Sequence, residues 1–196
     1  GGRIMKIGID IDDTLTDIRD KLKLAAEKYA SELGKEKRED KYIEDNNNGN
    51  TYQIKYGFTY EELKYFLSVI HEGITQKAAP RENCVEIIKK LHDEGHEIYI
   101  ITARDSEFHE DPYKLSKDWL DKNNVYYDKL IVNARNKLEI CRKENIELFI
   151  DDQLANCTKL SEAGIKVIRI TEYTDNHGDI INKKNWNEIY NYIKET

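Results

Sequence analysis

The spacing of hydrophobic residues along the chain alternates between the period of a β-strand and the period of an α-helix. Ile7, Ile9 and Ile11 alternate with other residues, which is typical of a buried strand. From residue 80 onward, helical stripes of apolar residues alternate with short runs rich in isoleucine and leucine. This alternation predicts an α/β fold, a doubly wound parallel sheet with helices on both faces. The further strands are expected at residues 96–101, 129–132, 146–150 and 165–170, and a last helix at 186–193.

Between the first strand and residue 80 the pattern is helical and contains no expected strand. Apolar positions from 18 to 33 recur at helical spacing, and Asp17 is placed to cap this helix. Thr59 and Glu62 have the spacing of a capping box and predict the start of a second helix. The polar segment 35–57, with its asparagine-rich run at 46–50, is interpreted as a loop.

The two expected helices need a partner for their apolar faces, so we expect them to pack together as a small cap. The α/β core then consists of residues 5–17 and 80–196, and the cap of residues 18–79. Residues 1–4 precede Met5, which is the single methionine, and are interpreted as a tag remnant. A length of 196 residues suits one core with an insertion.

Composition narrows the range of partners. The formal net charge is -7 and the basic residues are dispersed, which argues against a polymeric nucleic acid as partner. No apolar run approaches the roughly 20 residues of a membrane span, so no membrane association is expected. Cys84, Cys141 and Cys157 are widely spaced and are interpreted as reduced core residues of a cytoplasmic protein. The sequence does not decide whether the chain forms a homo-oligomer.

Three carboxylates, Asp10, Asp12 and Asp13, crowd the carboxyl end of the first expected strand. Carboxylates that lie close together raise one another's pKa and resist burial, so the cluster requires either water or a bound cation. Capping of the next helix is the simplest alternative role, but one aspartate would be enough for that.

Polar residues also follow the other expected strands. Thr102 and Arg104 come after the second, and Asp151 and Asp152 after the fourth. Because ligands of doubly wound sheets bind at the carboxyl ends of the strands, these side chains are expected to surround one site. Oxygen ligands without nearby Cys or His candidates favour Mg²⁺. Lys137, near the start of its helix, and the Thr102 hydroxyl are suited to hold a phosphate group.

A phosphate at this site would lie beside a carboxylate that can attack it. We assign Asp10 as the nucleophile that forms an aspartyl-phosphate. Asp12, two residues further on, is assigned to protonate the leaving oxygen and then to accept a proton from the hydrolytic water. Magnesium and Lys137 would offset the charge on the transferring group.

The motif residues resemble those of the haloacid dehalogenase superfamily. Residues 10–14 match its DxDxT signature, and the run ending in Thr102 is similar to its second motif. Lys137 is placed like the lysine of the third motif, and Asp151 and Asp152 resemble the acidic fourth motif. The resemblance implies that Asp10 and one of these two acids ligate Mg²⁺ through their side chains, whereas Asp12 does so through its backbone carbonyl.

The resemblance extends to a branch of the superfamily. An acid two residues after the nucleophile is typical of its phosphatases and phosphomutases, and an insertion between the first two motifs is its first cap type. The runs at 101–104 and 186–190 are similar to those of the 5'(3')-deoxyribonucleotidase group and its bacterial relatives. This implies hydrolysis of (deoxy)nucleoside monophosphates. A phosphatase of another small metabolite such as a sugar phosphate, a phosphomutase, and a non-catalytic ligand-binding member of the fold are the alternatives.

The cap is rich in aromatic residues, which can stack on a base. Tyr52, Tyr56 and Phe58, in the expected loop, are the candidates for this contact. Thr14, which is also expected to order its turn, and Arg104 complete the candidate substrate contacts. An equally plausible role for Arg104 is a salt bridge with an acid between residues 105 and 111.

Overall fold

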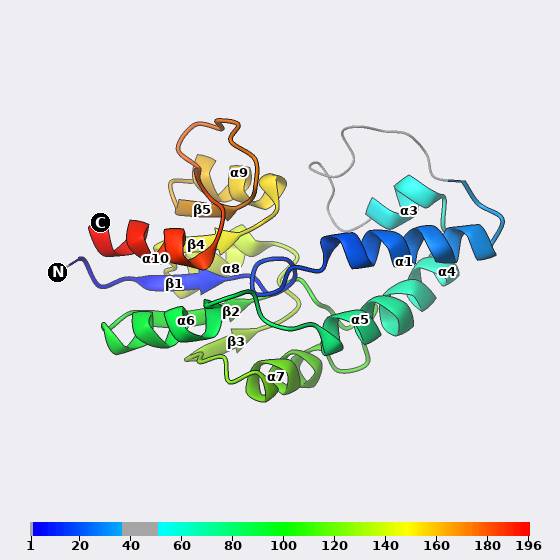
Figure 1. Ribbon diagram of the computed structural model, residues 1–196, viewed down its shortest axis with the longest axis horizontal. Coiled ribbons are helices and arrows are strands. Elements are labelled where there is room, and N and C mark those ends of the chain that lie inside the picture. Colours follow the sequence, from blue (N-terminus) through cyan, green and yellow to red (C-terminus); the bar gives the residue numbers. More distant parts are fainter. Residues whose placement is uncertain (1, 37–50) are drawn as a thin grey trace.

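A computed structural model describes residues 2–36 and 51–196, in which six parallel strands form one sheet (Figure 1). The strand order is β3-β2-β1-β4-β5-β6, so β1 lies in the interior and the order reverses beside it. This confirms the predicted doubly wound α/β fold. The strands are β1 (Lys6–Ile9), β2 (Glu97–Ile101), β3 (Lys129–Ile131), β4 (Leu148–Asp151), β5 (Lys166–Ile170) and β6 (Ile181–Lys183).

Helices cover both faces of the sheet (Figure 1). On one face, apolar side chains of three helices pack with alternate strand residues such as Ile98 and Ile100; on the other face, two helices pack around Phe149 and Val167. Because both faces are buried, the central strands are almost continuously apolar. The first group is α6 (Cys84–Asp93), α7 (Pro112–Lys122) and α10 (Trp186–Glu195), and the second is α8 (Lys137–Glu144) and α9 (Leu154–Glu162).

The remaining helices lie together beyond the carboxyl end of β1 (Figure 1). Helix α1 packs against both η1 and α3, and the capping box at Thr59 and Glu62 is present as predicted. The division of the chain at residues 17 and 80 stays a prediction. The elements of this cap are α1 (Arg19–Glu32), α3 (Thr51–Tyr56), α4 (Tyr60–Tyr65), the π-helical turn η1 (Phe66–His71) and α5 (Glu72–Lys77).

Two local predictions need correction, and one strand was missed. The segment 35–57 is not a loop throughout, because α3 occupies residues 51–56; the asparagine run at 46–50 lies outside the described residues. Strand β6 was not predicted, since it has three half-buried residues, of which only Ile181 is apolar. Asp17 does not cap α1; the backbone N–H of Ile18 instead donates to the Asp13 carboxylate at 3.0 Å.

Glycine is required at position 8 of β1 by a close approach of the neighbouring strand. Gly8 is paired with Phe149 of β4, and a Cβ atom at Gly8 would lie 2.6 Å from Cδ2 of that ring. The ring itself is fully buried, so it has no open space into which it could turn. The contact keeps β1 and β4 closely packed where both lead into the cluster of acids.

Replacing Gly8 with alanine is therefore expected to lower the free energy of unfolding by about 1–3 kcal/mol, because the core is overpacked. Gly73→Ala is the matched control, since no atom lies within 4 Å of its added Cβ and alanine favours the helix. Thermal unfolding followed by circular dichroism checks both variants. An unchanged melting temperature in Gly8→Ala would show that this contact imposes no constraint.

Candidate active site

The loop after β1 folds back sharply and places its acids at the end of the sheet. The backbone N–H groups of Thr14 and Leu15 both donate to the carbonyl of Ile11. Asp13 has a φ of 61°, in the left-handed region that aspartate tolerates better than most residues. Its carboxylate holds the start of α1 through Ile18. Asp13, which the sequence left without a role, therefore shapes the loop and fixes the residue that precedes α1.

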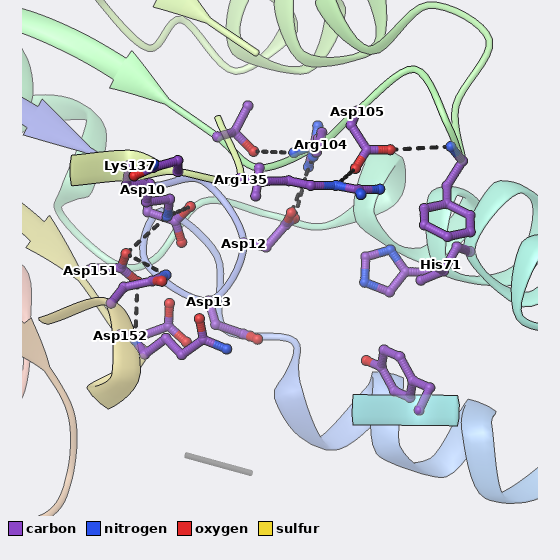
Figure 2. A pocket seen from close by; sticks show the side chains of 18 of the residues that line it. Asp10, Asp12, Asp13, His71, Arg104, Asp105, Arg135, Lys137, Asp151 and Asp152 are labelled. Atoms are coloured by element: carbon purple, nitrogen blue, oxygen red, sulfur yellow. Dashed lines mark hydrogen bonds and ion pairs between the residues drawn. The ribbon is translucent and has the colours of Figure 1, made fainter. Parts of the chain in front are cut away.

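Lys137 joins the acids of two neighbouring strands (Figure 2). Its Nζ lies 2.9 Å from Oδ1 of Asp10 and 2.9 Å from Oδ2 of Asp151, and all three side chains are buried. Asn136 caps α8 by accepting from the N–H of Glu139, so Lys137 occupies the first helical position. Residues predicted from three separate motifs thus meet at one point.

The acids at this point carry more negative charge than one ammonium group neutralises. Burial raises the pKa of Asp10 to about 7; Lys137 opposes this effect, while Asp151 and Asp12 add to it. Burial, followed by the charges of Asp151 and Asp10, raises the pKa of Asp152 as well. Excess negative charge of this kind is stabilised by a bound cation.

The donor set fits a hard divalent cation. Carboxylate oxygens of Asp10, Asp151 and Asp152 lie within 4.8 Å of one another, and no His or Cys joins them among the described residues. Asp151 also accepts from the Gln153 N–H at 3.0 Å and from Nδ2 of Asn156 at 3.2 Å. These contacts fix the orientation of its carboxylate.

Thr14 and Arg19 orient Asp152 from the other side. The Thr14 hydroxyl lies 3.1 Å from Oδ1 of Asp152 and 3.3 Å from Oδ2 of Asp10, and Nη2 of Arg19 lies 2.8 Å from Oδ2 of Asp152. Thr14 is fully buried and does not line the cavity, so the structure places it behind the carboxylates rather than among the substrate contacts.

Asp12 points to a different partner (Figure 2). Nη2 of Arg104 lies 2.8 Å from its Oδ1 and Nε lies 3.2 Å from its Oδ2. Burial alone would raise the pKa of Asp12, but the Arg104 guanidinium and its hydrogen bonds lower this pKa to about 2. The alternative of a salt bridge between Arg104 and an acid in 105–111 is wrong, because the salt bridge is made with Asp12.

A cavity of about 1520 Å³ opens in front of these residues and separates them from the cap. Thr102 lines it, and its Oγ1 accepts from the Arg104 N–H at 3.3 Å, which leaves the hydroxyl hydrogen available to a ligand. Tyr52 and His71 line the cavity from the cap, and His71 faces Asp12 across it (Figure 2).

The predicted aromatic contacts differ in accessibility. Tyr52 and Tyr56 lie on helix α3 and not in a loop, so that prediction is wrong. Tyr52 is half-buried at the cavity wall with its ring 4.7 Å from that of Phe66. Tyr56 and Phe58 are each 2% exposed in the aromatic core of the cap, and Phe58 does not line the cavity. Tyr56 also borders the cavity, but Tyr52 is the more exposed of these rings.

Several contributors to the site had not been singled out from the sequence. Arg19 is a basic residue in the first turn of α1, where the helix dipole disfavours a cation. This position was a signal that an acid must lie nearby, and the acid is Asp152. Asn156 and His71 gave no comparable signal, because nothing in their spacing relates them to the acidic motifs.

Two further predictions concern the environment of the protein. Within residues 2–36 and 51–196, no helix combines the length and apolar character needed to cross a membrane. Cys84, Cys141 and Cys157 are buried free thiols. A cytoplasmic location and the oligomeric state stay predictions.

The fold is similar to that of solved hydrolases of the haloacid dehalogenase type, in agreement with the resemblance of the motifs. A candidate member from Bacillus subtilis, YfnB, solved with bound magnesium, matches it with a TM-score of 0.62 at 16% identity, over 97% of this chain and 99% of that one. The model of the family "5' nucleotidase, deoxy (Pyrimidine), cytosolic type C protein" matches residues 3–196. The chain belongs to this family.

Relatives of similar length agree with the family. A nucleotidase of Clostridium acetobutylicum is 29% identical, with 96% of this chain and 93% of that protein covered. A candidate nucleotidase of Bacillus cereus is 30% identical, with 97% and 99% covered. The chain is thus an enzyme of the phosphatase and nucleotidase class, in contrast to the non-catalytic alternative.

The raised pKa of Asp10 predicts a pH dependence of stability. Between its ordinary value of 3.8 and about 7, the folded state binds a proton that the unfolded state does not. In the presence of a chelator, the free energy of unfolding is expected to fall by about 1 kcal/mol as pH rises from 6 to 8. Asp10→Asn removes this titration and should show a weaker decline. Thermal melts at three pH values measure the difference, and parallel curves for the two proteins would contradict it.

Proposed function

We propose that this enzyme is a Mg²⁺-dependent phosphomonoesterase that hydrolyses (deoxy)nucleoside monophosphates, in particular 5'-phosphates, through an aspartyl-phosphate on Asp10. The observation that carries the proposal is that Asp10, Lys137 and the acids at the end of β4 meet at one large cavity. Membership of the nucleotidase family supports the substrate class.

Asp10 and one or both of Asp151 and Asp152 would hold the metal through their side chains, and Asp12 through its backbone carbonyl. The hard oxygen donors and the excess negative charge fit Mg²⁺, and the magnesium in the B. subtilis hydrolase supports this choice. When bound, Mg²⁺ would supply positive charge at the phosphoryl oxygens during transfer.

In the first step, a carboxylate oxygen of Asp10 attacks the phosphorus while the bond from phosphorus to the nucleoside oxygen breaks. The Lys137 ammonium, already 2.9 Å from Asp10, offsets charge on the transferring group, and the Thr102 hydroxyl donates to one of its oxygens. Water then attacks the phosphorus of the aspartyl-phosphate, releasing inorganic phosphate and restoring Asp10.

Asp12 moves the protons in both steps. It gives a proton to the leaving nucleoside oxygen, and as the carboxylate it then accepts one from the attacking water. In the free protein Asp12 is ionised beside Arg104. A phosphate dianion placed next to it adds negative charge, which raises the pKa of Asp12 and allows it to take up the proton that it transfers.

The cavity has room for a whole nucleotide. Its volume of about 1520 Å³ exceeds the roughly 300–1,000 Å³ of ordinary small-ligand pockets. A phosphate beside Asp10 directs the rest of the substrate toward the cap, where the Tyr52 ring can stack on a base. Tyr52 is a better candidate than Tyr56, which borders the cavity but is 2% exposed, and than Phe58, which does not border it.

The Asp10→Asn variant is expected to release no inorganic phosphate above background from any nucleotide, because an amide cannot form the aspartyl-phosphate. A phosphate-release assay over a panel of nucleotides and sugar phosphates with Mg²⁺ measures this loss and the substrate preference. Asp118→Asn, an exposed change on α7, should keep wild-type turnover. Turnover by Asp10→Asn would remove the nucleophile assignment, and a preference for sugar phosphates would overturn the nucleotide assignment alone.

Tyr52→Ala is expected to lower kcat/KM for a nucleoside monophosphate by about 5- to 150-fold, because a base stack contributes about 1–3 kcal/mol. Hydrolysis of glycerol phosphate, which has no base, should change little. Tyr113→Ala, an exposed tyrosine on α7 away from the cavity, is the control. Equal losses on both substrates would indicate that Tyr52 supports the cap and does not contact the base.

A further inference from the structure

Arg104 has almost no contact with solvent, although it borders the cavity. Its side chain is 5% exposed, against 26% for the Asp12 side chain. Its guanidinium donates to both carboxylate oxygens of Asp12 and, through Nη1 at 3.4 Å, to the Ser116 hydroxyl. These contacts use both terminal nitrogens and Nε. One N–H remains on each terminal nitrogen, but the side chain is only 5% exposed, so little of the guanidinium is accessible to a substrate.

The backbone of Arg104 is held from several sides. Its N–H donates to the Thr102 hydroxyl, and its carbonyl accepts from the Asn133 N–H at 2.8 Å. Ser116, which receives the guanidinium, is itself fixed on α7 by donating to the Pro112 carbonyl at 2.8 Å. The residue is therefore anchored to β2, to the segment after β3 and to α7, all of which belong to the sheet side of the cavity.

The two partners of the pair are unequal. A buried guanidinium that loses its carboxylate is strongly destabilised, and among the described residues Asp12 is the acid that pairs with Arg104. Arg104 is thus the fixed partner, and Asp12, on the loop after β1, is the side chain whose direction is set by the contact. The bidentate geometry fixes both the position and the plane of the carboxylate.

We propose that Arg104 is a positioning residue that aims the Asp12 carboxylate at the oxygen of the leaving group, and that it is not a substrate-binding residue. The proposal rests on the proposed function, in which Asp12 transfers the proton. Misplacement of a catalytic group by about 1 Å can reduce a rate about 100-fold, so an arginine that never touches the substrate can still control the proton transfer.

This role has a signature that depends on the leaving group. The alkoxide of a nucleoside is a poor leaving group and needs the proton from Asp12. The anion of an acidic phenol is a good leaving group and departs without that proton. If the Asp12 carboxylate is misplaced, the hydrolysis of nucleotides should therefore slow far more than that of a phenyl phosphate whose phenol is acidic. Loss of a substrate contact, or a general loosening of the fold, would not discriminate between phenols by their acidity.

The test compares kcat/KM of wild type and Arg104→Gln on a series of phenyl phosphates whose phenols differ in pKa, together with a nucleoside monophosphate. Because kcat/KM covers the steps up to departure of the leaving group, later hydrolysis of the aspartyl-phosphate does not enter. We expect a loss of about 10- to 100-fold on the nucleotide and on the least acidic phenol, falling to less than about 3-fold on the most acidic one.

Control variants separate this inference from the proposed function. Asp12→Asn should show the same dependence on the leaving group with larger losses, and Arg104→Gln added to it should cause no further discrimination. Arg104→Lys, which keeps one charged donor, should recover part of the loss. Arg135→Gln removes another arginine of the cavity wall, one paired with Asp105 and Glu107, and should give equal losses across the series.

The dependence of the loss in kcat/KM on the pKa of the phenol does not change with the folded fraction of a preparation, because all substrates are measured on the same sample. Equal losses across the series for Arg104→Gln, or a higher KM for every substrate at unchanged kcat, would overturn the positioning role while Asp12→Asn still supports the mechanism. Absence of the leaving-group effect in Asp12→Asn itself would instead overturn the proton-transfer role that the proposed function gives to Asp12.

Discussion

The site depends on the contact of one buried ammonium group with carboxylates from two neighbouring strands. Ile9 of β1 is paired with Ile150 of β4, so the next residues, Asp10 and Asp151, emerge side by side. The Asp10 N–H continues the ladder by donating to the Ile150 carbonyl at 3.1 Å. Without Lys137 at the start of α8, these buried acids would have no opposite charge between them. The sheet register, the helix cap and the electrostatics of the site therefore depend on one another.

Sequence reasoning predicted this part of the molecule well, for a physical reason. Isoleucine-rich strands and helical stripes are local patterns, and the rule that ligands gather at the carboxyl ends of parallel strands converts them into a position in space. Asp10, Thr102, Lys137 and Asp151 were brought together in this way. Each lies at the end of a strand or the start of a helix, where the backbone alone largely determines the location of the side chain.

Local patterns and the rule for strand ends could not predict the partners of Arg104 or the burial of Tyr56 and Phe58. Arg104 and Asp12 are 92 residues apart, and acids between 105 and 111 were nearer in the chain. What brings them together is the pairing of β1 with β2, followed by loops whose conformation no periodicity records. The burial of Tyr56 and Phe58 was missed for a related reason. A small cap fills its core with aromatic rings, and the same residue type serves both packing and ligand contact.

The location of Arg104 also separates two properties of the site. Its anchors, Thr102, Asn133 and Ser116, lie on the sheet side of the cavity, whereas Tyr52 belongs to the cap. In the proposed mechanism, the acid that transfers the proton is thus positioned from the same side of the cavity that holds the proposed nucleophile. The loop that follows Arg104 does contact the cap, where Nδ1 of His109 lies 2.9 Å from Oε2 of Glu72. This contact involves Glu72 of α5 and not Tyr52, so under the proposed function a change of the Tyr52 ring is expected to alter nucleoside binding while Asp12 keeps its direction.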